Sequence, residues 1–357
     1  MFIQRKNYLN DLQRIRVSEG RDLENGLRLD RNEKVGIWDK NMLTEIFSKQ
    51  PDYFLSVYPD STNLYNKIAK HNGIDPSQVL VTSGIDGALK TIYDVMTEPG
   101  DLVGVATPTY AMYYVYAKIF QVNLDCIEYT DDLKFNFKAF DSFLEKKPSV
   151  FFLPNPNQPV ESAFNIDELR IFAQKTLEKN CLFVIDEAYF MFGCDSGVDL
   201  INEFENVVVT RTFSKGFGVP SIRLGYMMSN VSNMNVLTKT RMAHESNSLI
   251  NAVGEYLLDN YSIVENYNNK VIESRDNLKT ELAELGIKTH GSNGNFLLLD
   301  IGDPEKAESF VKFLREKLIY VKGPWSKPRD KYITITIGPK ELMNKFLDAT
   351  KEFLKNY

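Results

Sequence analysis

The sequence VVVTRTFSKGFG at residues 207–218 joins a short apolar run of β-branched residues to a lysine that stands between phenylalanines and glycines. Four comparable apolar runs precede it along the chain: VLVT at 79–82, LVGVA at 102–106, VFFL at 150–153 and LFVI at 182–185. Longer stretches with helix-like patterns separate these runs, at residues 87–97, 110–119, 137–146 and 166–179. This alternation predicts an α/β fold in which one largely parallel, buried sheet is covered by helices.

The length of the chain predicts more than one domain. Its 357 residues exceed the size at which a single hydrophobic core usually stops growing. From about residue 251 the pattern changes to a long, charged helical stretch, which is followed by the apolar segments NFLLLDI and YITITIG. We therefore expect a large domain over residues 45–250, and a smaller α+β lobe built from residues 1–44 together with residues 251–357.

Composition and charge limit the classes of partner. The net charge of −6 at pH 7 gives no general attraction to nucleic acid or to an anionic membrane surface. No apolar run approaches the length of a membrane span, and the first residues lack the apolar core of a signal peptide. Three cysteines without CxxC spacing and three histidines predict neither a disulfide framework nor a metal site. We expect a cytoplasmic protein that binds a small-molecule substrate, with no nucleic-acid and no membrane partner.

Open α/β sheets bind ligands at the carboxyl ends of their strands, so the residues after each apolar run are the candidates for a site. After residue 82 the turn SGIDG opens a helix, and the main-chain NH groups of Gly84, Ile85 and Asp86 would form a cradle for a phosphate. An ordinary tight turn with an aspartate cap is the alternative. Tyr110 follows the next run, where it would either stack on a planar ring or pack in the core.

The ends of the last two runs carry charged residues. Asp186 at the tip of a buried strand would stay ionised beside a positive partner such as a protonated pyridine nitrogen. A helix cap or a buried salt bridge is the alternative. Lys215 lies in an apolar setting, which lowers the pKa of a lysine and favours the neutral amine that forms a Schiff base. A solvated surface charge is the alternative for a single lysine. Thr212, Ser214 and Arg223 lie close by in sequence and would bind a phosphate.

This ordered set of a phosphate turn, an aromatic residue, an acid, a lysine and an arginine resembles the fold-type I aminotransferases that depend on pyridoxal phosphate (PLP). Within them it is most similar to the histidinol-phosphate aminotransferase-like group. The resemblance extends from about residue 29 to residue 338 and includes these motifs: LDRNEKVG, YPD, SGIDG, PTYAMY, PNPNQP, IDEAY, RTFSKGFG, IRLGY and NFLLLD. It implies pyridoxal 5'-phosphate as cofactor, and a large lobe with a mostly parallel sheet plus a smaller α+β lobe.

The resemblance also implies a role for each matching residue. Lys215 resembles the Schiff-base lysine, Asp186 the partner of the pyridine nitrogen, and Tyr189 a hydrogen-bond donor to the ring oxygen; these are the expected catalytic residues. The other expected cofactor contacts are Gly84, Ile85, Asp86, Tyr110, Asn157, Thr212, Ser214 and Arg223. Tyr58 of the neighbouring subunit would reach the cofactor phosphate, which implies a homodimer with shared active sites.

Two departures from the family pattern lie in loops around the expected site. Gln158-Pro159-Val160-Glu161 replaces Asn-Pro-Thr-Gly, so that either Gln158 or Asn157, which we favour, contacts the ring oxygen. The loop around Asn32, which lines the substrate pocket in this family, reads Asn-Glu-Lys-Val in place of Asn-Glu-Asn-Pro.

A third departure concerns substrate binding. Thr334 stands where the family has an arginine that binds the donor's carboxylate or the substrate's phosphate. An uncharged threonine cannot make that bidentate contact. Lys322 and Arg329 are the candidates to replace the lost charge, and a solvated surface position is the alternative for both. The changes argue against histidinol phosphate itself as substrate.

These patterns favour an aminotransferase that acts on a small phosphorylated amine or keto substrate, with an amino acid such as glutamate as donor. A PLP-dependent decarboxylase of the phosphoserine or phosphothreonine type would use the same cofactor site and is the alternative. A non-catalytic binding protein on the same scaffold is disfavoured because Lys215, Asp186, Tyr189 and Arg223 are all retained. A dinucleotide-binding oxidoreductase is disfavoured because no GxGxxG follows the first strand.

Overall fold

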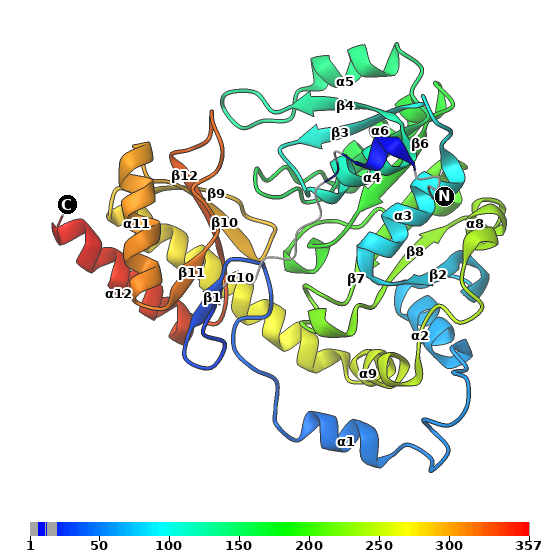
Figure 1. Ribbon diagram of the computed structural model, residues 1–357, viewed down its shortest axis with the longest axis horizontal. Helices are drawn as coiled ribbons and strands as arrows, with labels where there is room; N and C mark the ends of the chain where they lie inside the picture. Colours follow the sequence, from blue (N-terminus) through cyan, green and yellow to red (C-terminus); the bar gives the residue numbers. More distant parts are fainter. Residues whose placement is uncertain (1–5, 11, 13–19, 357) are drawn as a thin grey trace, which may run out of the picture.

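The computed structural model describes residues 6–10, 12 and 20–356 and contains two lobes, the larger on the right of Figure 1. A seven-stranded sheet with the order β2-β8-β7-β6-β5-β3-β4 forms the larger lobe. Its strands are β2 (Val79–Thr82), β3 (Leu102–Thr107), β4 (Asn123–Glu128), β5 (Val150–Pro154), β6 (Leu182–Asp186), β7 (Val207–Thr212) and β8 (Gly225–Ser229). Strand β8 is antiparallel to both of its neighbours, whereas the other pairs are parallel. The expected α/β class with a mostly parallel sheet is confirmed.

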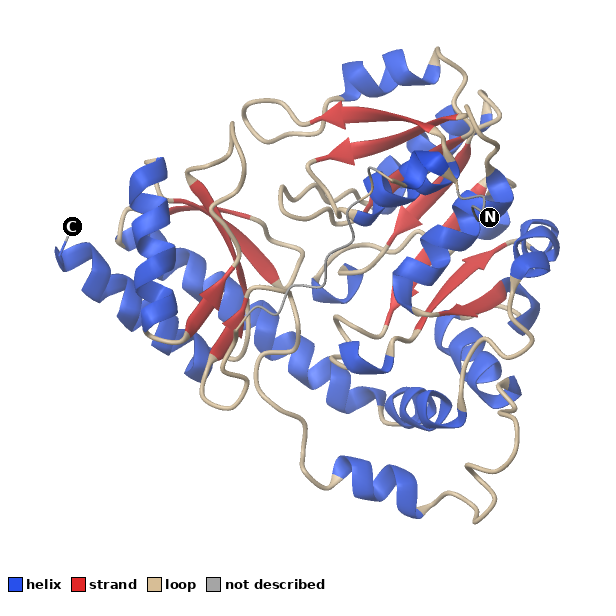
Figure 2. Ribbon diagram, in the orientation of Figure 1, coloured by secondary structure: helices blue, strands red, loops and turns tan. Residues whose placement is uncertain are grey.

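Helices cover both faces of this sheet (Figure 2). The helices of the larger lobe are α2 (Thr62–Asn72), α3 (Gly84–Met96), α4 (Met112–Phe120), α5 (Phe137–Leu144), α6 (Ile166–Leu177), α7 (Leu200–Glu203), α8 (Val231–Leu237) and α9 (Ser248–Asp259). Two hydrophobic clusters fill the layers between them and the sheet. One cluster is rich in phenylalanines such as Phe151 and Phe172, and the other surrounds Tyr93, Tyr113 and Phe152. Because both faces are buried, the strands are apolar throughout and their ends are the places left for polar chemistry.

The smaller lobe joins the two ends of the described chain. Strand β1 (Leu27–Leu29) pairs in parallel with β11 (Ile319–Val321), beside a three-stranded sheet of β12 (Tyr332–Thr336), β10 (Phe296–Asp300) and β9 (Lys288–His290). Its helices are α10 (Tyr261–Glu284), α11 (Pro304–Glu316) and α12 (Lys340–Asn356). Its core contains Leu29 and Val35 from the N-terminal part together with residues of these later elements.

Two helices lie outside the sheets or between the two lobes. Helix α1 (Met42–Ser48) lies below the larger lobe in Figure 1, and α10 runs from the larger lobe into the smaller one. The long helical stretch expected from residue 251 is two helices, because the backbone leaves the helical conformation at Asn260 (φ −110°, ψ 39°). No helix among the described residues is both long and apolar enough to cross a membrane.

Candidate active site

A cavity of about 420 Å³ opens at the carboxyl ends of β5, β6 and β7, beside the start of α3. This is the position at which open α/β sheets bind ligands, and the volume is that of a small-molecule site. The cavity brings together most of the residues that the sequence singled out: Ile85, Asp86, Tyr110, Asp186, Tyr189, Thr212, Ser214, Lys215 and Arg223. It also contains Arg31, Glu33, Thr109 and Gln158, among others.

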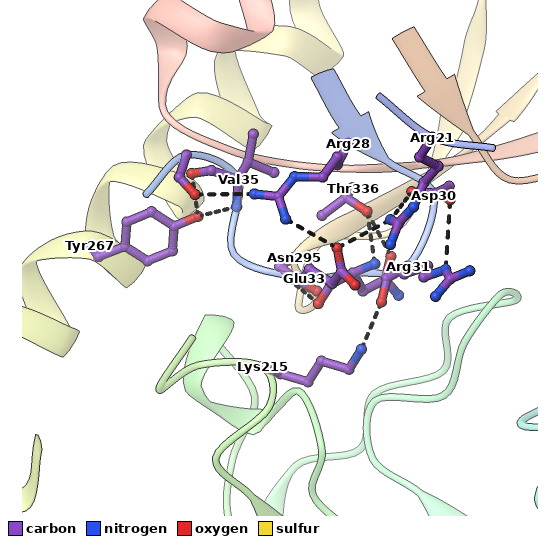
Figure 3. Close-up of polar contacts among 12 residues, drawn as sticks. Arg21, Arg28, Asp30, Arg31, Glu33, Val35, Lys215, Tyr267, Asn295 and Thr336 are labelled. Atoms are coloured by element: carbon purple, nitrogen blue, oxygen red, sulfur yellow. Dashed lines mark hydrogen bonds and ion pairs between the residues drawn. The ribbon is translucent and has the colours of Figure 1, made fainter. Parts of the chain in front are cut away.

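Lys215 follows β7, and its Nζ donates a hydrogen bond to the main-chain oxygen of Arg31 at 2.8 Å (Figure 3). Burial lowers the pKa of Lys215 to about 8, with opposing effects from Glu33, which raises it, and Arg223, which lowers it. At pH 7 about a tenth of such amines are neutral, since the pKa lies one unit above the pH. The amine is therefore available to attack a carbonyl at neutral pH.

Asp186 ends β6 with its side chain almost fully buried. Its carboxylate accepts hydrogen bonds from the Tyr113 hydroxyl at 2.7 Å and from the Ala188 main-chain NH at 3.1 Å. Burial raises the pKa of Asp186 to about 6, although both hydrogen bonds act in the opposite direction. A cation beside this carboxylate would lower the pKa again, so the position suits a ligand with a positively charged ring nitrogen. Tyr113 ends the PTYAMY motif, in which the sequence analysis predicted a role only for Tyr110.

Tyr189 lies opposite a loop from the smaller lobe. We call residues 30–36 the N-terminal loop. Asn32 in this loop has a left-handed backbone (φ 53°) and donates from Nδ2 to the Tyr189 hydroxyl at 3.0 Å. The Asn32 Oδ1 accepts from the Thr336 hydroxyl, and its main-chain oxygen accepts from the Asn295 Nδ2. Asn32 is therefore fixed by β12 and by the residue that precedes β10, and it in turn holds the Tyr189 hydroxyl.

The turn before α3 approaches a second backbone closely. Gly84 has φ 66°, and a Cβ added at Gly225 would lie 2.6 Å from the Gly84 carbonyl carbon. Arg223 directs Nη2 to the Asp86 carboxylate at 3.4 Å, and Tyr110 donates its hydroxyl to the same side chain at 2.8 Å. The free NH groups of a helix start, next to an arginine, form a site suited to a phosphate.

The residues present fit pyridoxal phosphate. The cavity offers a lysine amine with a lowered pKa, a buried carboxylate, the ring of Tyr110 and a phosphate-type turn beside Arg223. The buried Thr109 hydroxyl lines the cavity and has no hydrogen-bond partner among the described residues. An orphaned polar atom in a cavity wall is expected where a ligand supplies the partner.

The two candidates for the ring-oxygen contact, Asn157 and Gln158, lie in different surroundings. Asn157 is fully buried and its Nδ2 donates to the main-chain oxygens of Pro108 and Val160, at 3.0 and 2.8 Å. It does not line the cavity, because these bonds hold its amide inside the turn. The neighbouring Gln158 lines the cavity instead. Of the two candidates for the ring-oxygen contact, Gln158 is therefore the one at the cavity wall.

Three other predicted residues lie away from the cavity. Tyr58 is 81% exposed and stacks on His244, with ring centroids 4.6 Å apart. Lys322 lines an adjoining cavity, and Arg329 lines neither. The structure therefore does not bring these three side chains to Lys215 within one chain.

The N-terminal loop also places two residues that the sequence did not single out. Glu33 lines the cavity, and its carboxylate is 3.2 Å from Arg21 and 3.6 Å from Arg28. Arg31 lines the same cavity and lies over Lys215 in Figure 3. The signal that was available is the motif LDRNEKVG itself, whose charged residues flank Asn32.

Comparison with known proteins agrees with this geometry. The family model described as aminotransferase class I and II matches residues 29–349. The histidinol-phosphate aminotransferase of Thermoanaerobacter pseudethanolicus is 30% identical over 333 residues, which cover 92% of this chain and 93% of the relative. The dihydroxyacetone phosphate transaminase of Campylobacter jejuni is 30% identical over 344 residues, which cover 93% and 91%. 

A solved structure gives the same result for the fold. The histidinol-phosphate aminotransferase of Sinorhizobium meliloti, in complex with pyridoxal-5'-phosphate, has a TM-score of 0.83 and 24% identity, and the match covers 93% of this chain and 91% of that one. The chain belongs to the class I and II aminotransferases, and it is an enzyme that depends on pyridoxal 5'-phosphate.

Proposed function

We propose that this enzyme transfers an amino group between an amino acid such as glutamate and a small phosphorylated keto or amine substrate. The observation that carries the proposal is the cavity wall formed by the N-terminal loop: it contains the cation Arg31, while Thr334 stands where the family has its carboxylate-binding arginine. Two relatives of 30% identity are named for phosphorylated substrates, histidinol phosphate and dihydroxyacetone phosphate, which supports the proposal. The altered N-terminal loop argues against histidinol phosphate itself.

Specific roles follow for the residues of the cavity. Lys215 would hold the cofactor, Asp186 would pair with its ring nitrogen, and Tyr189 together with Gln158 would bind its ring oxygen. Tyr110 would stack on the ring. The phosphate would bind the NH groups of the helix start and these side chains: Thr212, Ser214 and Arg223.

Pyridoxal phosphate, when bound, supplies an electron sink that stabilises a carbanion at the substrate's α-carbon. The chain's own contribution is proton transfer and electrostatics. Once its amine is released, the Lys215 Nζ would take a proton from that carbon and return one, because its lowered pKa keeps part of the amines neutral. Asp186 would stay ionised beside a positive nitrogen, held by the Tyr113 hydroxyl.

The same proposal includes a homodimer with shared active sites. Tyr53 and Val57 are large hydrophobic residues with exposed side chains, and both line one surface cavity together with Tyr58. Exposed apolar residues concentrated in one region are typical of a subunit interface. Tyr58, which does not line the active-site cavity of its own chain, would then reach the cofactor phosphate of the partner.

Decarboxylation of a phosphorylated amino acid is the second candidate, because it needs the same cofactor contacts and differs in the bond that the pocket orients. The relatives at 30% identity are both named as aminotransferases, which favours transamination. The test is to incubate the holoenzyme with glutamate and a series of small phosphorylated ketones and to measure 2-oxoglutarate. In parallel, phosphoserine and phosphothreonine are offered and carbon dioxide is measured. Carbon dioxide without 2-oxoglutarate would reverse the assignment.

A further inference from the structure

The position of the missing family arginine is closed to an anion in this chain. Thr334 is 1% exposed, and its hydroxyl accepts a hydrogen bond from the Trp325 indole at 2.9 Å. Its main chain also pairs with that of Lys322, through two hydrogen bonds. Since Thr334 is neutral, buried and already bonded, a substrate carboxylate or phosphate has to be bound elsewhere.

Few positively charged side chains of the active-site cavity could bind the anionic group of a substrate. Among the described residues that line it, the positively charged side chains are Arg31, Lys215 and Arg223. Lys215 and Arg223 belong to the cofactor half, at the end of β7 and beside the turn before α3. Arg31 comes from the other wall, where its main-chain oxygen is bonded to the Lys215 Nζ. Its backbone is therefore fixed directly above the reacting amine (Figure 3).

Arg31 also lines a second cavity, of about 660 Å³, in the smaller lobe. The other basic residues of this second cavity are Arg21, Arg315 and Lys322. The second cavity is also lined by the carboxylate of Asp30, which is 3.0 Å from Arg21 Nη1 and 3.8 Å from Arg31 Nε. Positive charges therefore outnumber negative ones around this space, which favours an anion.

We propose that Arg31 is the specificity-determining residue that binds the phosphate of the substrate, at the place where this residue lines both cavities. This inference rests on the proposed function and adds the position of the phosphate. The planar guanidinium of an arginine can bind two phosphate oxygens through paired N–H groups, a geometry that the ammonium group of a lysine lacks. Because the Arg31 main-chain oxygen is bonded to the Lys215 amine and Arg31 lines the active-site cavity, a phosphate bound by Arg31 belongs to a substrate whose reacting carbon lies in the same cavity.

The test is a comparison of Arg31→Gln with the wild-type holoenzyme. The substrates are dihydroxyacetone phosphate and its unphosphorylated analogue dihydroxyacetone, each with glutamate. We expect KM for the phosphorylated ketone to rise by roughly 10- to 100-fold, the effect of losing a charge-assisted contact. KM for dihydroxyacetone and the visible absorbance of the bound cofactor should not change. Arg31→Lys should recover part of the loss, because it keeps the charge without the paired geometry.

Lys327→Gln is the matched control, since it removes one positive charge from an exposed loop residue that lines neither cavity. It should leave both KM values unchanged. An equal KM for dihydroxyacetone phosphate in wild type and Arg31→Gln would overturn the inference and leave the proposed function standing. If the wild type transaminates no phosphorylated ketone, the proposed function fails. In that event calorimetry would compare the binding of inorganic phosphate to the wild-type and Arg31→Gln holoenzymes. Weaker binding to Arg31→Gln supports Arg31 as a phosphate site, and equal binding overturns it.

Discussion

Removal of the Tyr113 hydroxyl tests how Asp186 is kept ionised. In Tyr113→Phe the carboxylate loses a hydrogen bond of 2.7 Å inside the buried core, while its bond from the Ala188 NH stays. A hydrogen bond to a charged group contributes about 1.5–3 kcal/mol, and one pKa unit corresponds to about 1.4 kcal/mol. The pKa of Asp186, about 6 in the native protein, should therefore rise by roughly one to two units.

A higher pKa of Asp186 should weaken the binding of PLP at neutral pH. Pairing with a positive ring nitrogen requires the ionised carboxylate, so affinity for PLP falls as the pH drops through the pKa of Asp186. That fall should be centred near pH 6 in the wild type, and roughly one to two pH units higher in Tyr113→Phe. At pH 7 the ionised fraction drops from about nine tenths to between about a half and a tenth, which predicts roughly a two- to tenfold weaker Kd.

The assay is titration of the apoenzyme with PLP at a series of pH values, followed by visible absorbance. Tyr129→Phe is the matched control, because it also removes a buried hydroxyl, which lies 2.6 Å from Ser162 and away from Asp186. The control should follow the wild-type profile. Superimposable profiles of Tyr113→Phe and the wild type would refute the reasoning, since the hydrogen bond would then contribute nothing to the ionisation of Asp186.

Three further predictions concern neighbouring features. Since neutral Lys215 reacts, the rate of covalent PLP uptake, trapped with borohydride, should rise with pH through about 8 and level off; a rise continuing to the usual lysine range would contradict the lowered pKa. Arg211→Met leaves the buried Glu187 carboxylate without its partner at 2.8 Å, so urea unfolding should show a loss of about 3–5 kcal/mol, and a loss below 1 kcal/mol would count against it. Gly225→Ala forces the turn at Gly84 to move and should weaken PLP binding without destroying the fold seen by circular dichroism.

The sequence predicted the strands whose residues are buried on both faces. The runs at 79–82, 150–153 and 182–185 coincide with strands because continuous apolar residues leave few alternatives. Strands β4 and β8 were not predicted. Strand β4 lies at the edge of the sheet and is largely polar, and β8 begins at a glycine inside a quoted motif, so neither has the continuous pattern of a central strand.

The site residues that lie next to the end of a strand in the sequence could be predicted. Lys215, Asp186 and Arg223 lie in the cavity because their places relative to the sheet are fixed by local sequence. The contacts made across the chain were not predictable. Tyr113 reaches Asp186 from a helix 73 positions earlier, and the position of Gln158 at the cavity wall, with Asn157 bonded inside the turn, depends on hydrogen bonds that the sequence does not reveal.

The N-terminal loop also bears on the order in which the enzyme is completed during synthesis. Asn32 is held by Thr336 and Asn295, and β1 pairs with β11, so this wall of the cavity consists of residues separated by about 300 positions. All seven strands of the sheet around Lys215 lie within residues 79–229, so they leave the ribosome long before the strand containing Thr336. The nascent large lobe is therefore expected to present an open cofactor cup with no wall over the lysine. Capacity to bind PLP would then arise earlier on the ribosome than capacity to select a substrate.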